Sequence, residues 1–295
     1  MELRQLEYFI AVAGEMSFSR AAHRVHVVQS ALSTSVGKLE KELGVELFDR
    51  SRQQIRLTPA GELLREHARR VIESARLAKE SVSDFRGQLT GTVELGSLIA
   101  FGTLDIPRVL GEFRQAYPHV RIRLRQSQTG SMAYLSAIAD GSLDLALVSA
   151  PDRFPAGVNM RLLAEEPMVF VCRDSHRLAC RDRVALTELA DEDLIGFPVE
   201  FGLRRLVDDA FRAAGVSAHT PYEVAAEYSK AAALVRHGLG SVFMPASEAA
   251  HYPDLRAVHV QPTVMWTIYL ASAERIGPAS AKLAELLVAA ADGAR

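Results

Sequence analysis

A row of short polar side chains lies along one face of a predicted helix near the N-terminus. In the stretch VVQSALSTSVGKLEKELG, residues 27–44, an apolar stripe recurs with helical spacing at Leu32, Val36, Leu39 and Leu43. The opposite face carries Gln29, Ser30, Ser33, Thr34 and Lys38. Glutamine, serine and threonine hydrogen-bond to base edges, and a slim helix that bears them fits the DNA major groove. The pattern predicts a DNA-reading helix; a solvated helix with a low-charge surface is the alternative.

The sequence before this helix predicts two shorter helices that would hold it in place. The second of them begins after Ser17, whose hydroxyl can cap its first turn. Only residues 26–28 separate that helix from the polar one, and Gly44 is placed to end the polar helix. So tight a connection between two helices is typical of a helix-turn-helix.

Residues 45–58 change from helical to extended character. The stretch ELFDRSRQQIRLT predicts a short hairpin, or wing, with its turn at residues 51–54. Basic side chains cluster in this wing at Arg50, Arg52 and Arg56. Cations in such a position suit contacts with the DNA backbone or the minor groove.

A long helix is predicted after the wing, with Thr58 as its cap and Pro59 as its first residue. Apolar side chains follow spacings of four and three at Leu64, Ala68, Val71, Ala75, Ala78, Val82 and Phe85. Such a heptad seam favours a dimerising coiled coil. An amphipathic helix that packs on the core of its own chain is the alternative.

The remainder of the chain alternates predicted strands and helices, which indicates an α/β fold with parallel strands. A second round begins near PMVFVC at residues 167–172, so we expect two lobes with a cleft between them. Ligands bind at the carboxyl ends of parallel strands. The side chains expected there are Ser97, Phe101, Thr103, Gln128, Thr129, Ser131 and Ser149, with Phe197 and Phe201 across the cleft. Each is equally consistent with a loop cap or a core aromatic.

Two features bear on the charge of such a ligand. The helix that follows Thr103 presents an N-terminus, which favours an anion. Arg204 is a candidate clamp for a carboxylate, although a surface role fits it better.

The composition and the absent motifs exclude several classes of protein. A hydrophobic content of 48% with a net charge of −2 is typical of a globular protein. No apolar run reaches the length of a membrane span and no export signal is visible, so we expect a cytoplasmic protein without a membrane partner. The sequence lacks a nucleophile elbow, a phosphate-binding loop and paired metal motifs, which argues against an enzyme.

Cys172 and Cys180 are the two cysteines of the chain. Their spacing is compatible with a redox switch, but two silent thiols are the simpler interpretation. His176 between them makes no zinc-binding spacing, and no metal or cofactor is expected.

Residues 1–88 resemble the N-terminal part of LysR-type transcriptional regulators. The resemblance rests on LRQLEYFIAVA, SFSRAAHRVHV, QSALSTSVGKLEKELGVELFDR and LTPAGELL. The rest of the chain is similar in strand order and length to the effector-binding region of that family. Two departures stand out. Val28 replaces the usual Ser or Thr cap, so that Ser30 could cap a later helix start, and Thr34 and Gly37 stand where Arg is frequent.

The resemblance implies an α/β multidomain protein with three parts. They are a winged helix-turn-helix at 1–58, a linker and dimerisation helix at 59–88, and a two-lobed effector-binding domain at 89–295, like type 2 periplasmic binding proteins. Lobe I would cover about 89–163 and 267–295, and lobe II about 164–266.

The function implied is that of a regulator, active as a homodimer or homotetramer, that binds double-stranded promoter DNA and responds to a small-molecule effector, often a carboxylate. RNA polymerase is the further partner expected if the protein is an activator. By the resemblance, Gln29, Ser30, Ser33, Thr34 and Lys38 face DNA, with Arg50 and Arg52 in the wing. An enzyme or a solute-binding protein with the same two lobes and no role on DNA is the alternative.

Overall fold

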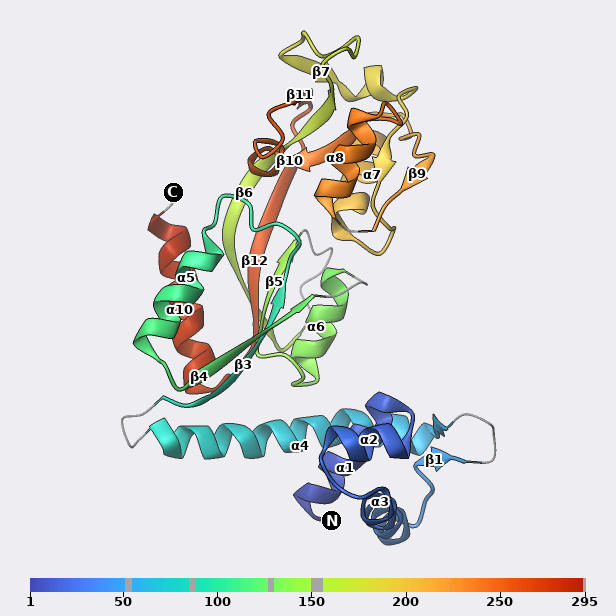
Figure 1. Cartoon of the computed structure of the whole chain (residues 1–295), viewed down its shortest axis with the longest axis vertical. Coiled ribbons are helices and arrows are strands. Elements are labelled where there is room, and N and C mark those ends of the chain that lie inside the picture. The colour runs from blue at the N-terminus through green and yellow to red at the C-terminus, as the bar shows by residue number, and fades with distance from the viewer. Residues whose placement is uncertain (51–54, 85–88, 127–129, 150–155, 226, 294–295) are drawn as a thin grey trace. The chain divides into compact units, whose positions relative to one another are not determined.

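The computed structural model describes residues 1–50, 55–84, 89–126, 130–149, 156–225 and 227–293 (Figure 1). The chain forms two compact units, which divide between residues 88 and 89. Each unit has its own hydrophobic core.

The first unit begins with three helices, α1 (Leu3–Glu15), α2 (Phe18–Arg24) and α3 (Gln29–Leu43). The Ser17 hydroxyl caps α2 by accepting from the Arg20 N–H at 3.3 Å, as predicted. Gly44 ends α3 with a φ of 70°, in the left-handed region that glycine adopts without strain. Helix α3 starts at Gln29 with Val28 as its uncapped N-cap residue, so the alternative of a later start capped by Ser30 is wrong.

The wing is a short antiparallel pair of strands, β1 (Phe48–Asp49) and β2 (Arg56–Leu57). The Phe48 ring lies 5.4 Å from that of Phe9 and 5.6 Å from that of Phe18, and these contacts fasten the wing to the helices. Helix α4 (Pro59–Asp84) follows, and the Thr58 hydroxyl accepts from the Gly61 N–H at 3.0 Å. The predicted start of the long helix is therefore confirmed.

The second unit is built on a twisted sheet with the strand order β4-β3-β5-β12-β6-β11-β7. Strands β3 (Gly91–Ser97), β4 (Val120–Gln126) and β5 (Leu145–Ser149) pair in parallel, as expected. Helices α5 (Ile106–Ala116) and α10 (Pro278–Gly293) lie side by side on one face, and α6 (Ser131–Ala139) covers the other (Figure 1). Strand β12 (Met265–Ala273) runs antiparallel to β5, which the purely parallel expectation missed.

Two long strands connect the halves of this unit. Strand β6 (Val158–Arg173) has 16 residues; its first half pairs with β12, and its second half pairs with β10 (Val242–Pro245) and β11 (Leu255–Gln261). The expectation of a fresh strand near residue 167 was wrong, because β6 already begins at Val158 and continues through that point. β6 and β12 therefore span the unit (Figure 1).

The smaller elements of the second unit surround the far half of β6. They are β7 (Arg183–Ala185), a 3-10 helix (Leu186–Leu189), β8 (Ile195–Gly196), α7 (Gly202–Ala213), β9 (Tyr222–Glu223), α8 (Tyr228–Arg236) and α9 (Ala246–Ala249). The Phe243 ring on β10 makes edge-to-face contacts with Phe170 at 6.1 Å and with Phe211 at 5.8 Å. These aromatic contacts pack α7 against the sheet.

Candidate DNA interface and ligand pocket

The two faces of α3 differ in the way that the sequence predicted. Leu32, Val36 and Leu39 are fully buried in the core of the first unit. Leu43, expected to complete the stripe, is 40% exposed because α3 ends there. Gln29, Ser30, Thr34 and Lys38 are exposed and Ser33 is half-buried, so one face presents all five predicted polar side chains. Within the described residues, none of these five side chains is held by a hydrogen bond or an ion pair, which leaves them free for a partner.

A half-buried glutamate on α3 holds the start of the wing. Glu40 Oε1 accepts hydrogen bonds from the N–H groups of Leu47 at 2.9 Å and Phe48 at 3.3 Å. Glu40 Oε2 accepts from Arg50 Nη2 at 2.8 Å, and the Arg50 guanidinium lies 4.8 Å from the centre of the Phe18 ring. Arg50, a predicted DNA contact, is thus tied to its own domain; Arg52 lies outside the described residues. The sequence pattern did not predict this role of Glu40, because its hydrogen-bond partners lie beyond the end of the helix.

The apolar side chains of α4 divide between two roles. Ala68 is buried and Leu64 half-buried against the core of the first unit, as the alternative interpretation of the seam requires. Further along, Val71 is 46% exposed and Val82 is 65% exposed. Phe85 lies outside the described residues. Among the described residues of the seam, Val71, Ala78 and Val82 are therefore exposed along this helix.

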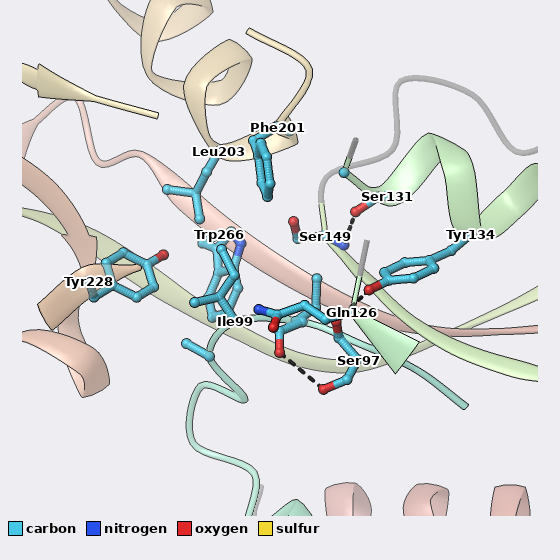
Figure 2. Close-up of a pocket in the computed structure, with 14 residues that line it drawn as sticks. Ser97, Ile99, Gln126, Ser131, Tyr134, Ser149, Phe201, Leu203, Tyr228 and Trp266 are labelled. Atoms are coloured by element: carbon cyan, nitrogen blue, oxygen red, sulfur yellow. Dashed lines mark hydrogen bonds between the residues drawn. The ribbon is translucent and has the colours of Figure 1, made fainter. Parts of the chain in front are cut away.

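The second unit contains a small pocket, with a free volume of about 30 Å³, at the carboxyl ends of β3, β4 and β5 (Figure 2). Four predicted residues line it: Ser97, Ser131, Ser149 and Phe201. Ser131 Oγ accepts from the Ser149 N–H at 3.1 Å, so α6 and β5 are joined at the pocket wall. The pocket lies where the parallel strands of the first round predicted it.

Three of the predicted effector contacts lie outside the described lining. Phe197 is buried in the core, edge-to-face with Tyr228 at 5.2 Å. Phe101 packs against the core and Thr103 is exposed, ahead of the residue that caps α5. That cap is Asp105, whose carboxylate accepts from the Arg108 N–H at 3.0 Å and occupies the helix end expected to attract an anion. Gln128 and Thr129 lie outside the described residues.

Arg204 is engaged within its own helix. Its Nε lies 3.0 Å and 2.9 Å from the two carboxylate oxygens of Asp208, one turn further along α7. Its Nη1 donates to the Phe197 carbonyl at 3.3 Å. These bonds engage the guanidinium within α7 and the loop before it. The side chain is 19% exposed, so it is more buried than the surface role that the sequence favoured.

Three aromatic residues of the pocket were not anticipated. The Tyr134 hydroxyl donates to the Ser97 carbonyl at 2.7 Å and fixes the end of β3. Tyr228 is 3% exposed and Trp266 is 2% exposed, and both line the pocket. Neither the Tyr228 hydroxyl nor the Trp266 Nε1 has a hydrogen-bond partner in the described structure. Trp266 is the single tryptophan of the chain, and its place inside a predicted strand was the one available signal.

A buried carboxylate lies beside the pocket lining. None of the described lining residues carries a charged side chain. Glu166, on β6, is buried and is paired across strands with Trp266. Its carboxylate accepts from the Ser247 N–H at 2.7 Å and from the Ser247 hydroxyl at 2.8 Å. Burial raises the pKa of Tyr228 well above its usual range, and Glu248 and Glu166 raise it further.

The cysteines differ in environment. Cys172 on β6 is buried, and burial together with Glu192 and Asp174 raises its pKa to about 11, so its thiol stays protonated. Cys180 is exposed. The described part of the chain brings together no group of three residues that could hold a metal ion, and none of its helices is long and apolar enough to cross a membrane.

Comparison with known families identifies both units. Residues 3–62 match the bacterial regulatory helix-turn-helix family lysR, and residues 86–292 match the LysR substrate binding domain. An uncharacterized HTH-type transcriptional regulator, YybE of Bacillus subtilis (strain 168), is 34% identical over 83% of this chain and 82% of its own length. The HTH-type transcriptional regulator BudR of Raoultella terrigena is 34% identical over 84% of this chain and 85% of its own length.

Solved structures show the same arrangement of elements. A full-length OxyR variant from Pseudomonas aeruginosa superposes with a TM-score of 0.78 at 25% identity, over 99% of this chain and 94% of that chain. Full-length CbnR in complex with its target DNA gives a TM-score of 0.67 at 26% identity, over 100% of both chains. This chain therefore belongs to the LysR family and is a DNA-binding transcriptional regulator whose C-terminal domain binds a small-molecule effector.

Proposed function

We propose that the regulator reads its operator with the exposed face of α3. Gln29, Ser30, Ser33 and Thr34 supply hydrogen bonds to base edges, while Lys38 lies further along the helix, where it meets a phosphate. One observation carries this assignment: these polar side chains are unpartnered on a helix whose opposite face is buried at Leu32, Val36 and Leu39. A solvated helix would need no such concentration of uncharged donors and acceptors on its leading turns.

In this proposal the wing contacts the sugar-phosphate backbone of DNA through Arg50 and Arg52. Arg50 also pairs with Glu40, so a phosphate must share or replace that carboxylate. Thr34 and Gly37 bring no cation to the helix at positions where Arg is frequent in the family. Compared with a domain that has both arginines, this one should neutralise fewer phosphates, and its binding should depend less on salt. We therefore expect affinity to depend on paired half-sites bound by linked copies of the domain.

Pairing of the copies is assigned to α4. Its exposed side chains Val71, Ala78 and Val82 lie on one face of the helix, where a second α4 would cover them. This gives a homodimer, and two dimers give the homotetramer that the family resemblance implies. Promoter DNA and, for an activator, RNA polymerase are the cytoplasmic partners in this proposal.

The effector is assigned to the pocket of the second unit. Ser97, Ser131, Ser149 and Phe201 come from four separate elements or loops around it, so a bound molecule contacts both halves of the unit. Because β6 and β12 continue through both halves, a ligand that draws the halves together bends these strands rather than separating them. The resulting population shift re-spaces the reading helices on DNA.

A gel-shift series on the DNA upstream of the gene tests the DNA assignment. Gln29→Ala and Ser33→Ala should relax the preference among base substitutions in the site, whereas Arg52→Ala should weaken specific and random DNA alike. Ser217→Ala, which alters an exposed serine of the second unit, is the matched control and should change neither. Equal losses on specific and random DNA for all three variants would contradict the assignment, and no shift for the wild type would favour an enzyme or solute-binding protein.

A further inference from the structure

Two buried hydrogen-bond donors without partners lie in the wall of the pocket. The Tyr228 hydroxyl and the Trp266 indole N–H each have no partner in the described structure and no exposure to water. They come from α8 and β12, elements far apart in the sequence, yet both line the same pocket (Figure 2). Buried polar groups in native proteins are nearly always hydrogen-bonded, so two orphaned donors at one cavity point to a bound molecule that satisfies them.

The chemistry of these groups defines what the molecule must offer. An indole N–H donates and cannot accept, so its partner is an acceptor atom. The Tyr228 hydroxyl stays protonated, because burial raises its pKa well above the usual range and the carboxylates of Glu248 and Glu166 raise it further. Both groups are therefore hydrogen-bond donors in residues that line the pocket.

The charge of the surroundings disfavours an anion at this position. Among the described lining residues no lysine, arginine or histidine is present. Glu166 is the cross-strand partner of Trp266, and both side chains also border Gly102: a Cβ there would lie 2.7 Å from Glu166 Oε1 and 3.2 Å from the indole ring. A carboxylate buried beside this negative group, with no cation among the described lining residues, would be destabilised.

The rest of the wall is apolar. Its hydrophobic members are Leu98, Ile99, Ala100, Phe201 and Leu203. We infer that the effector is an uncharged, mostly apolar molecule with one acceptor oxygen, of the carbonyl type, that bonds to the Tyr228 hydroxyl and the Trp266 indole N–H. This inference rests on the proposed effector role of the pocket and differs from the carboxylate that the family resemblance implied.

The single tryptophan allows a direct test in the full-length protein. With ¹⁵N-labelled tryptophan the indole N–H gives one signal per chain. Three probes of similar size separate the chemistries: acetophenone carries a neutral acceptor, benzoate carries an anion, and ethylbenzene carries no acceptor. Titrations followed by this signal and by calorimetry, on the wild type, Tyr228→Phe and Tyr252→Phe, give the affinities. Tyr252→Phe is the control, because its hydroxyl bonds to Glu248 outside the pocket lining.

We expect acetophenone to shift the indole signal to the position of a hydrogen-bonded N–H and to bind more tightly than the other two probes. Tyr228→Phe should lower the affinity for acetophenone about three- to tenfold, which is the effect of losing one hydrogen bond. The same substitution should leave the affinity for ethylbenzene unchanged. Tyr252→Phe should alter neither affinity.

Two kinds of result would overturn the inference. If benzoate binds as tightly as acetophenone, or if Tyr228→Phe weakens acetophenone and ethylbenzene alike, the assigned ligand chemistry is wrong and the effector pocket remains. If no probe perturbs the indole signal at millimolar concentration, the inference fails together with the effector role of the pocket. The gel-shift series on α3 is independent of both results.

Discussion

Glu40 and Arg50 join the reading helix to the wing through an ion pair with an Nη2–Oε2 distance of 2.8 Å. The other oxygen of the same carboxylate accepts from two backbone N–H groups at the start of the wing, Leu47 and Phe48. The Glu40 side chain is 13% exposed, so water cannot easily replace it. One carboxylate therefore fixes where the wing leaves α3.

Replacing Glu40 should unfold the first unit more easily. We expect Glu40→Ala to lower the free energy of unfolding by about 1–3 kcal/mol, because it leaves part-buried N–H groups without an acceptor. Arg50→Ala should cost less than about 1 kcal/mol, since that pair is partly exposed and screened. Urea titration measures both, with Glu46→Ala at an exposed position as the control. A larger loss for Arg50→Ala than for Glu40→Ala would show that the backbone bonds are unimportant.

Helix α3 lacks the side-chain cap that its N-terminus can accept. Val28 is 68% exposed and adopts φ −74° and ψ 141°, an extended conformation suited to a capping serine. Val28→Ser should raise the free energy of unfolding by about 1 kcal/mol through a hydrogen bond to the first turn. Val28→Ala removes the same apolar surface without adding an acceptor and should give no such gain. Thermal unfolding compares the two, and equal midpoints would contradict the capping argument.

Two glycines of the first unit should respond oppositely to alanine. At Gly61 a Cβ would come within 2.2 Å of the Leu47 carbonyl oxygen, which the backbone can relieve only by moving α4 from the wing. We expect Gly61→Ala to destabilise the protein by about 1–3 kcal/mol, as overpacking does. Gly37 lies within α3 with open space around it, so Gly37→Ala should stabilise by about 0.5–1 kcal/mol. Urea titration of both variants decides whether close approach, rather than glycine itself, is required.

The unpartnered hydroxyl of Tyr228 should reduce the stability of the ligand-free protein. Tyr228→Phe removes a buried group that has no partner, and we expect it to raise the free energy of unfolding by about 1 kcal/mol. Tyr252→Phe deletes a hydroxyl bonded to Glu248 and should have the opposite sign. Calorimetric unfolding without added ligand measures both. A loss of stability in Tyr228→Phe would mean that the hydroxyl is satisfied within the protein.

The two thiols should differ in reactivity. Because burial raises the pKa of Cys172 to about 11, its thiolate is scarce at pH 8, and the buried strand also blocks access. We expect iodoacetamide to alkylate Cys180 alone in the native protein and both cysteines after denaturation. Mass spectrometry of the native sample reads the result directly. If native Cys172 were alkylated as fast as Cys180, the result would contradict this expectation and favour the redox interpretation.

Local sequence patterns determined the first unit almost completely. The spacing of Leu32, Val36 and Leu39, the cap at Ser17 and the glycine at position 44 are each encoded within a few residues, because helices are stabilised by contacts three or four positions apart. The same locality predicted which side chains of α3 would face outward. It also predicted the parallel strands β3, β4 and β5, whose ends bring Ser97, Ser131 and Ser149 to one pocket.

Only the tertiary structure decided the contacts between elements that are distant in the sequence. The continuous strand β6, the antiparallel β12 and the pairing of Glu166 with Trp266 depend on residues about a hundred positions apart, which no short-range periodicity encodes. The same holds for the bonds from Glu40 to the wing and for the meeting of Tyr228 and Trp266 in one cavity. Whether a polar atom is buried and partnered depends on every element packed around it. The sequence therefore predicted the edge of the sheet at which the pocket lies, and the fold decided which groups line that pocket.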